Sequence, residues 1–394
     1  MTQTNPPLPI KTFLDRQQAL EDLLQSLVTR ESPTLSKESV DALGEFVADN
    51  MRRLGARINR HQREKAGDHW LGQWGPDKGG VLMLVHLDTV HPLGTLAQMP
   101  WKVEENWIKG PGALDMKAGL AMALTAIETL SEHDLLPNER ISLLCTSDEE
   151  TGSHSSQGLI EEQAKQHELV LCLEPAMPNG ALKTWRKGIG SFRLRARGQA
   201  AHAGNDPPTG VNAIVELAHQ IPALTQFADE HQGTTINIGV IQGGTRTNVV
   251  PDTCLLRFDV RVKDLAGQQE VDAALQALQP YLEGARLELE GEWNRPPMPR
   301  DERMLRTFQM ARKIGEGLGL TLKEDGTGGG SDANFVAPLG VPVLDGLGPV
   351  GIGAHSKRES VKRSSLPERT ALLAAILTQW KAAFQSDQAA PENP

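Results

Sequence analysis

The sequence predicts an α/β protein with a mostly parallel twisted sheet, helices on both faces of that sheet, and an inserted α+β domain with an antiparallel sheet. Apolar runs of strand length alternate with helical patterns in the first part of the chain, as expected for parallel strands joined by helical crossovers. A later segment alternates apolar with polar residues, which is typical of antiparallel strands solvated on one face. With 394 residues, the chain also exceeds the size that one hydrophobic core usually reaches.

The first part of the chain supplies the expected parallel sheet. Residues 13–27 and 36–54 carry apolar side chains at helical spacing, and residues 80–86 form a continuous apolar run that fits a strand covered on both faces. Gly110-Pro111-Gly112 indicates a sharp loop before a helix at 116–130, which is rich in alanine and leucine. Two further strands are expected at 141–146 and 169–173, and a helix is expected between them at 156–167.

The expected inserted domain begins at residue 188. Its three alternating strands are expected at 190–198, 235–241 and 254–262, and its helices at 211–224 and 268–278. The chain then returns near residue 296 to complete the first domain, with a helix, a short strand and a closing helix at 303–318, 341–344 and 366–384. The predicted domains are therefore 1–187 with 296–394, and 188–295.

Composition narrows the class of protein. The formal net charge is -10, and no basic stripe is visible, so a nucleic-acid partner is not expected. The three cysteines lie in apolar, strand-like stretches without CxxC spacing, which indicates small buried side chains and a reducing compartment: Cys145, Cys172 and Cys254. The first twenty residues lack a signal-peptide pattern, and no run approaches the ~20 apolar residues that span a bilayer, so we expect a cytoplasmic protein without a membrane partner.

An acidic pair follows the expected strand at 141–146. Glu149 and Glu150 come directly after Asp148, and consecutive residues at the end of a strand point in different directions. One carboxylate can therefore bind a metal ion while its neighbour moves a proton, which suggests metal-assisted hydrolysis. The alternative is a solvated acidic loop at the start of a helix, where carboxylates are favoured.

Other candidate ligands follow other expected strands. His86, Asp115, Glu174 and His355 all lie just beyond strand ends, where open α/β sheets bind ligands. Each has an ordinary alternative as a core histidine, a helix cap, a solvated strand end or a loop histidine. Their joint occurrence at one sheet edge favours a metal site.

The ligand types indicate a divalent cation. Imidazole with carboxylate oxygen suits zinc, with manganese or cobalt as substitutes. Two histidines and three or four carboxylates are too many for one tetrahedral site but suit two ions with a bridging carboxylate and an activated water. Asp88, two residues after His86, is suited to accept the proton on the second imidazole nitrogen; a local Asx-turn is the alternative.

Five motifs in this order resemble the M20 metallopeptidases. The resemblance covers about residues 80 to 365 and is strongest to the glutamate carboxypeptidase branch of the carboxypeptidase G2 type, with acetylornithine deacetylases and succinyl-diaminopimelate desuccinylases as relatives. It implies a zinc-exopeptidase-like fold. The motifs are His86-Leu87-Asp88-Thr89-Val90, Gly110-Pro111-Gly112 with Asp115-Met116-Lys117, Asp148-Glu149-Glu150-Thr151-Gly152-Ser153, Gly328-Gly329-Gly330-Ser331-Asp332 and the late His355.

The resemblance implies roles for these residues. Asp115 would bridge two zinc ions in each subunit, His86 and Glu174 would complete one site, and Glu150 and His355 would complete the other. Glu149 would be the general base, which takes a proton from the bridging water and passes it to the leaving amine. Family members with Glu at the position of Glu174 are typically carboxypeptidases and deacylases, so the substrate would be an N-acyl amino acid or a peptide with a C-terminal residue to be released.

The resemblance also implies that 188–295 is a lid and dimerisation domain, while 1–187 and 296–394 form the catalytic domain. His202 would polarise the scissile carbonyl, in its own subunit or across a homodimer; a surface histidine is the alternative. Asn248 and Arg261 would hold substrate, the latter by a bidentate grip on an α-carboxylate. The same small-molecule substrate could contact Arg295 and the backbone of Gly329 and Gly330, although a domain-boundary residue and a plain turn are the alternatives.

The sequence thus predicts a dizinc hydrolase that cleaves an amide next to a carboxylate-bearing amino acid, as a glutamate carboxypeptidase does. An N-acyl-amino-acid deacylase would use the same chemistry with a different acyl pocket. A non-catalytic binding protein on the same scaffold belongs to another class, and such a protein should have lost ligands that this chain retains.

Overall fold

The computed structural model describes residues 6–205, 209–229 and 231–388. The chain divides into two compact units, of which the first comprises Met1–Thr184, Arg300–Gly326 and Ser331–Pro394, and the second Trp185–Pro299 and Thr327–Gly330. The second unit therefore starts slightly before residue 188 and ends slightly after residue 295. It also contains 327–330, a turn that the sequence pattern assigned to the returning part of the chain, because arginines of the second unit hold its carbonyl groups.

The first unit is built on the mostly parallel sheet that the sequence predicts. Three neighbouring pairs are parallel, β6 with β3, β3 with β7, and β7 with β16, while β1 and β2 add an antiparallel edge. The order across the sheet is β1 (Arg57–His61), β2 (His69–Trp74), β6 (Ile141–Thr146), β3 (Val81–His86), β7 (Leu169–Cys172) and β16 (Val343–Leu344). The expected fold class is confirmed. Strands β1 and β2 were not predicted: β1 is short, largely polar and exposed, whereas β2 is buried but its sequence HWLGQW is neither a continuous apolar run nor a regular alternation.

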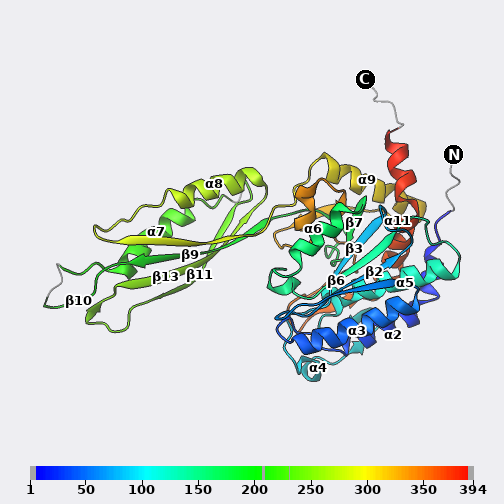
Figure 1. Cartoon of the computed structure of the whole chain (residues 1–394), viewed down its shortest axis with the longest axis horizontal. Helices are drawn as coiled ribbons and strands as arrows, with labels where there is room; N and C mark the ends of the chain where they lie inside the picture. Colours follow the sequence, from blue (N-terminus) through cyan, green and yellow to red (C-terminus); the bar gives the residue numbers. More distant parts are fainter. Residues whose placement is uncertain (1–5, 206–208, 230, 389–394) are drawn as a thin grey trace. The chain divides into compact units, whose positions relative to one another are not determined.

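Helices surround this sheet (Figure 1). They are α1 (Ile10–Leu14), α2 (Gln17–Val28), α3 (Lys37–Arg53), α4 (Thr95–Gln98), α5 (Ala118–Glu132), α6 (Gln157–Lys165), α9 (Glu302–Gly317), α10 (Ala333–Val336) and α11 (Ser365–Gln388), with a short turn of helix, η4, at Ala337–Leu339. None of the described helices combines the length and apolar character that a bilayer crossing requires.

The start of α5 differs from the sequence prediction. The pattern predicted a helix from residue 116, but the segment Ala113–Lys117 forms a separate tight turn, η1, before α5 begins at Ala118. Asp115 and Met116 leave helical geometry there, with φ/ψ of -116°/96° and -129°/35°. The reason is tertiary, because acceptors elsewhere in the unit bind backbone N–H groups of this turn.

Smaller ladders complete the first unit. A four-stranded sheet has the order β17 (Gly351–Ile352), β18 (Ser360–Lys362), β5 (Trp107–Lys109), β4 (Lys102–Val103), and β8 (Leu182–Arg186) pairs with β15 (Glu324–Thr327). Most of these strands have two or three residues, too few to show a period-two pattern, so the sequence did not predict them.

The second unit is an antiparallel sheet covered by helices. Its order is β11 (Thr235–Gly243), β13 (Thr253–Val262), β9 (Gly188–Arg197) and β14 (Arg286–Arg295), and α7 (Ala213–Thr225) and α8 (Leu265–Gln276) pack against it (Figure 1). Alternate residues of β9 and β13, such as Leu194 and Leu256, fill its core. A short antiparallel pair, β10 (Ala201–His202) with β12 (Val249–Val250), comes from the sequence between β9 and β13. Strand β14 was missed, although Leu287 and Leu289 alternate with charged residues in its sequence.

The cysteines lie as the sequence predicts. Cys145, Cys172 and Cys254 are buried within β6, β7 and β13. They behave as small core side chains.

Candidate metal centre

The candidate ligands of the first unit follow carboxyl ends of strands. His86 is the last residue of β3, Glu150 lies in η2 (Glu149–Thr151) just after β6, and Glu174 follows β7 by two residues. Asp115 lies in η1, between β3 and β6 in the chain, and His355 lies in the loop between β17 and β18. Because β6, β3 and β7 are neighbours in this order, His86 lies between the strand ends that carry the other two.

The carboxylate of Asp115 lies between two histidines. Its Oδ1 is 3.1 Å from Nε2 of His86, and its Oδ2 is 3.2 Å from Nε2 of His355. His355 Nε2 is also 3.1 Å from Oε2 of Glu150, while His86 Nε2 is 3.6 Å from Oε1 of Glu174. Each oxygen of one shared carboxylate thus faces a different histidine–carboxylate pair.

These side chains fit divalent cations. One potential ligand atom from each of His86, Asp115 and Glu150 lies within 4.8 Å of the others, and the same holds for His86, Glu149 and Glu174. Within the described residues, Oε1 of Glu150 is buried without a hydrogen-bond donor. A buried carboxylate oxygen without a donor is costly, and a cation would satisfy it.

The pKa values of the cluster show how strongly it attracts positive charge. Hydrogen bonds to Asp115 and Glu150 raise the pKa of His355 to about 11. Burial lowers the pKa of His86, but hydrogen bonds to Asp115, Asp88 and Glu174 outweigh it, so that the pKa lies well above its usual value. Burial alone would raise the pKa of Asp115, yet its bonds to both histidines depress it. The surrounding carboxylates thus favour the positively charged form of both histidines.

The backbone at His355 has an uncommon conformation. Its φ is +61°, in the left-handed region that few residues other than glycine adopt. Such a conformation persists only where surrounding contacts hold it, and here it accompanies the approach of the ring to Asp115 and Glu150.

Asp88 contacts His86, but not in the expected way. The Nδ1 atom of His86 lies 2.9 Å from the backbone carbonyl of Asp88 and 3.5 Å from its carboxylate. That carboxylate accepts hydrogen bonds from the Thr34 hydroxyl at 2.7 Å and from the backbone N–H groups of Glu149 and Glu150 at 3.3 and 3.2 Å. Asp88 therefore connects the imidazole to the acidic pair.

The acidic pair diverges because it lies in a tight helical turn, not at the very end of a strand. Successive residues of a 3₁₀ turn are separated by about 120° around its axis. The Glu150 carboxylate faces His355, whereas the half-buried Glu149 groups with His86 and Glu174. The geometry is thus compatible with one carboxylate binding a metal ion while its neighbour moves a proton. The two side chains diverge because of the helical turn, however, and not because they end a strand.

His202, in the second unit, has a defined ring tautomer. Its Nδ1 accepts hydrogen bonds from the backbone N–H groups of Gly204 and Asn205, both at 3.1 Å. A neutral ring that accepts at Nδ1 carries its proton at Nε2, so the exposed Nε2–H is a donor. Asn248 lies close by, because its backbone carbonyl accepts from the N–H of Ala203 at 3.0 Å.

The predicted substrate-binding arginines gather around 328–330 within the second unit. Arg261 donates from Nη1 to the carbonyl of Gly328 at 2.8 Å and from Nε to the Asp259 carboxylate at 2.9 Å. Arg295 lies so close to Gly330 that a Cβ there would be 2.5 Å from its Cδ. A side chain at position 330 would therefore displace Arg295.

Sequence reasoning missed Arg186, which belongs to the same group. This buried side chain donates from Nη1 to the carbonyls of Gly329 and Gly330, at 3.2 and 2.8 Å. The local sequence provided no signal for its burial, because the preceding segment 181–185 mixes apolar residues with Lys183 and Thr184.

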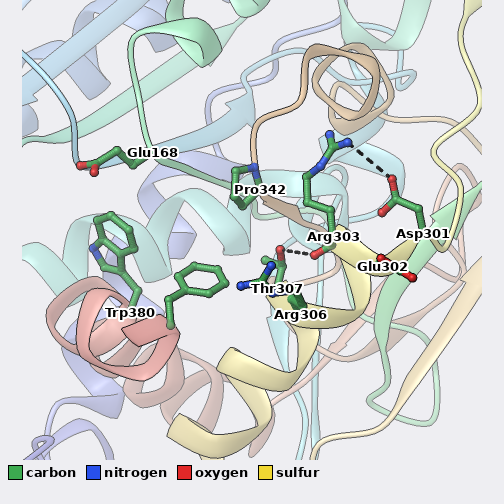
Figure 2. Close-up of a pocket in the computed structure, with 9 residues that line it drawn as sticks. Glu168, Asp301, Glu302, Arg303, Arg306, Thr307, Pro342 and Trp380 are labelled. Carbon is green, nitrogen blue, oxygen red and sulfur yellow. Dashed lines mark hydrogen bonds and ion pairs between the residues drawn. The ribbon is translucent and has the colours of Figure 1, made fainter. Parts of the chain in front are cut away.

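A separate cavity lies elsewhere in the first unit. Its volume is about 700 Å³. Aromatic, charged and smaller side chains line it (Figure 2), namely Glu168, Asp301, Glu302, Arg303, Arg306, Thr307, Pro342, Trp380 and Phe384. Glu168 and Pro342 precede β7 and β16, so the cavity is at the amino ends of these strands. None of the predicted site residues lines it. Open α/β sheets bind ligands at the carboxyl ends of their strands, which is the opposite edge of the sheet.

Comparison with known proteins gives a consistent result. Residues 82–379 match the model of peptidase family M20/M25/M40. The chain is 32% identical over 375 residues to carboxypeptidase G2 from Pseudomonas sp. (strain RS-16), covering 92% of this chain and 89% of that protein. It is 28% identical over 294 residues to a succinyl-diaminopimelate desuccinylase from Marinobacter nauticus, covering 70% of this chain and 76% of that protein.

Solved structures show the same fold. The crystal structure of aminopeptidase PepT from Bacillus cereus superposes with a TM-score of 0.75 at 23% sequence identity, covering 93% of this chain and 99% of that one. The family match and the similarity to carboxypeptidase G2 confirm the resemblance that the motifs indicated.

Zinc binding to the metal-stripped protein should release about two protons per chain, because both histidines have raised pKa values and must be deprotonated to bind a metal. The apparent zinc affinity should therefore increase with pH through the neutral range. Calorimetric titration in buffers of different ionisation enthalpy measures the proton release. His355→Ala should release fewer protons than the wild type, and a binding enthalpy independent of the buffer would contradict the expectation.

Proposed function

The chain belongs to peptidase family M20/M25/M40, and we propose that it is a dizinc amide hydrolase that releases a carboxylate-bearing amino acid, as a glutamate carboxypeptidase does. The observation that supports this most directly is the Asp115 carboxylate, whose two oxygens face His86 and His355. Asp115 would bridge two zinc ions, with His86 and Glu174 at one and Glu150 and His355 at the other; manganese or cobalt could replace zinc. Two such cations supply Lewis acidity to a carbonyl oxygen and lower the pKa of water toward neutrality.

Glu149 moves the proton in the proposed reaction. It accepts a proton from the attacking water and donates it to the leaving amine nitrogen, which is general base and then general acid catalysis. Its grouping with His86 and Glu174 supports this role, as does the bond from its backbone N–H to Asp88, which orients the turn.

His202 stabilises the oxyanion in the proposed reaction. Its donor is Nε2–H, because the backbone bonds to Nδ1 select that tautomer before substrate arrives. A donor that needs no reorganisation at the moment of reaction stabilises developing charge most effectively.

The second unit would recognise the carboxylate of the substrate. Arg261 and Arg295 would contact it together with Asn248 and the backbone of Gly329 and Gly330. The support is the convergence of guanidinium groups on 328–330 within this unit. A carboxylate accepts two parallel N–H bonds from one guanidinium, so arginine selects it by geometry as well as by charge.

An N-acyl-amino-acid deacylase is the second candidate, supported by the similarity to succinyl-diaminopimelate desuccinylase. Both candidates use the same centre and differ only in the group on the acyl side. A kinetic screen of the zinc-loaded protein against peptidyl-glutamate, succinyl and acetyl amino acids separates them: preferential turnover of peptidyl-glutamate supports the first, and turnover of only small N-acyl groups supports the second. A non-catalytic binding role is disfavoured, because all five ligand candidates and Glu149 are present.

Glu149→Gln should reduce kcat by at least about 100-fold, because the amide cannot accept the proton from water. Zinc content should remain that of the wild type, since the proposed ligand set excludes this side chain. Steady-state kinetics and metal analysis test both expectations. Glu162→Gln on α6 is a matched control that should leave kcat unchanged; a Glu149→Gln enzyme with near wild-type turnover would remove the proposed base.

His202→Ala should lower kcat by about 100- to 1000-fold with a smaller effect on KM, because the lost donor acts on the developing oxyanion. His202→Gln should retain part of the rate, since an amide N–H can still donate. His231→Ala, another exposed histidine of the second unit, serves as the control. Equal rates for His202→Ala and the wild type would exclude the role.

We further propose a homodimer through the second unit. Its outer strand β11 exposes Val240 and Ile241, which are 39% and 47% accessible, and an uncovered edge strand pairs readily with another copy. Sedimentation velocity should show twice the chain mass, and Ile241→Lys should shift the protein toward monomer. Leu289→Lys on the opposite outer strand β14 is the control. A wild type that sediments as a monomer would rule out the dimer.

We also propose a cytoplasmic location, which suits three buried thiols. Fractionation of the source cells tests it, and recovery of the protein outside the cytoplasm would contradict it.

A further inference from the structure

We propose that Glu359 is a positioning residue for the candidate metal centre, and this inference rests on the proposed dizinc function. Glu359 contacts none of the reacting groups. Its carboxylate instead connects the turn that carries Asp115 to the segments that follow His86 and His355. Neither the motifs nor the composition of the chain pointed to it.

Four donors surround the Glu359 carboxylate. Oε1 accepts the backbone N–H groups of Leu114 at 2.8 Å and Asp115 at 3.1 Å. Oε2 accepts the backbone N–H of Gly112 at 3.1 Å and Nε2–H of His91 at 2.6 Å. The side chain is only 1% exposed. Successive backbone N–H groups that converge on one anion form a concave binding site, and bonds to a charged acceptor are about twice as strong as neutral ones.

The turn at Ala113–Lys117 needs such an acceptor. The first N–H groups of a helix have no acceptor within the helix. Because Asp115 and Met116 also depart from helical geometry, the N–H groups of the turn before α5 need acceptors from elsewhere in the fold. Its shape is further set by Gly112, which has φ of +68° and where a Cβ would collide with the side chain of Thr89. The carboxylate therefore supplies acceptors for a conformation that has few of its own.

The three connected segments carry ligands of both proposed zinc sites. His91 follows His86 by five residues in the segment after β3, and Glu359 follows His355 by four residues in the loop before β18. The N–H of Glu359 also closes its own loop, by donating to the carbonyl of Ser356 at 3.1 Å. The buried carboxylate of Glu359 thus connects the Asp115 turn to the segment after His86 and to the loop after His355.

The position of this turn matters because Asp115 must direct one oxygen to each histidine. Its Oδ1 and Oδ2 lie at nearly equal distances, 3.1 and 3.2 Å, from the two Nε2 atoms. A rotation of the turn would shorten one contact and lengthen the other. Glu359 restrains that rotation through the N–H of Asp115 itself.

Glu359→Gln tests the role with the smallest change in shape. Glutamine keeps one acceptor oxygen but places an NH₂ donor against two of the four N–H groups, which leaves them without acceptors. Glu31→Gln is a matched control, because Glu31 also accepts two backbone N–H groups, from Gly94 at 2.9 Å and Leu96 at 2.7 Å. The segment 94–96 carries no candidate ligand.

The measurement is zinc affinity and stoichiometry of the full-length protein, by competition with a chromophoric chelator, together with the visible absorption of the cobalt-substituted protein. We expect Glu359→Gln to bind zinc about 10- to 100-fold more weakly than the wild type and to show an altered cobalt spectrum, as loss of an outer contact does at metal sites. Glu31→Gln should match the wild type in both.

Several outcomes would overturn the proposal. Wild-type affinity and spectrum in Glu359→Gln would do so, as would an equal loss of affinity in Glu31→Gln, since that loss would reflect general destabilisation. Should Glu359→Gln fail to fold, His91→Phe removes one donor and leaves the three backbone bonds: weaker zinc binding then supports the role and unchanged binding refutes it. A wild type that takes up no zinc would instead contradict the proposed function, and the positioning role with it.

Discussion

The candidate site depends on positive charge that offsets the repulsion between several carboxylates in one place. Asp115 approaches both histidines, Glu150 approaches His355, Glu174 approaches His86, and Glu149 groups with His86 and Glu174. Carboxylates packed at such distances repel one another, and burial raises the pKa of Glu150. The arrangement is favourable only with positive charge among the oxygens, which protons on the histidines supply and divalent cations would supply better.

The order of the strands in the sheet brings these residues together. Placing β3 between β6 and β7 brings His86 next to the acidic pair on one side and Glu174 on the other. Hydrogen bonds to backbone then fix the loops, through Asp88 at the acidic pair and Glu359 at the Asp115 turn. Asp332 adds a further link, since it accepts from Thr146 at the end of β6 and from Ser153 after η2. The loops of the centre are thus held mainly by buried carboxylates that are not themselves ligand candidates.

The two units carry different kinds of chemistry. The first holds the acidic and imidazole groups suited to cations, whereas the second gathers arginines around 328–330 and presents the Nε2–H of His202. The candidate cation ligands and the groups proposed to bind the substrate carboxylate thus belong to different units of the chain.

Much of the fold and of the candidate site followed from local sequence. Long apolar or periodic segments such as 80–86 and 303–318 predicted a strand and a helix. Residues at the ends of the expected strands identified the candidate ligands, because neighbouring parallel strands end at one edge of the sheet. Local sequence could not reveal the short strands, the burial of Arg186 or the role of Glu359. Those depend on contacts such as His91 with Glu359, 268 residues apart, which leave no local periodic pattern. Which oxygen of Asp115 faces which histidine, and which nitrogen of His202 carries the proton, were likewise decided only when the folded backbone supplied the partner atoms.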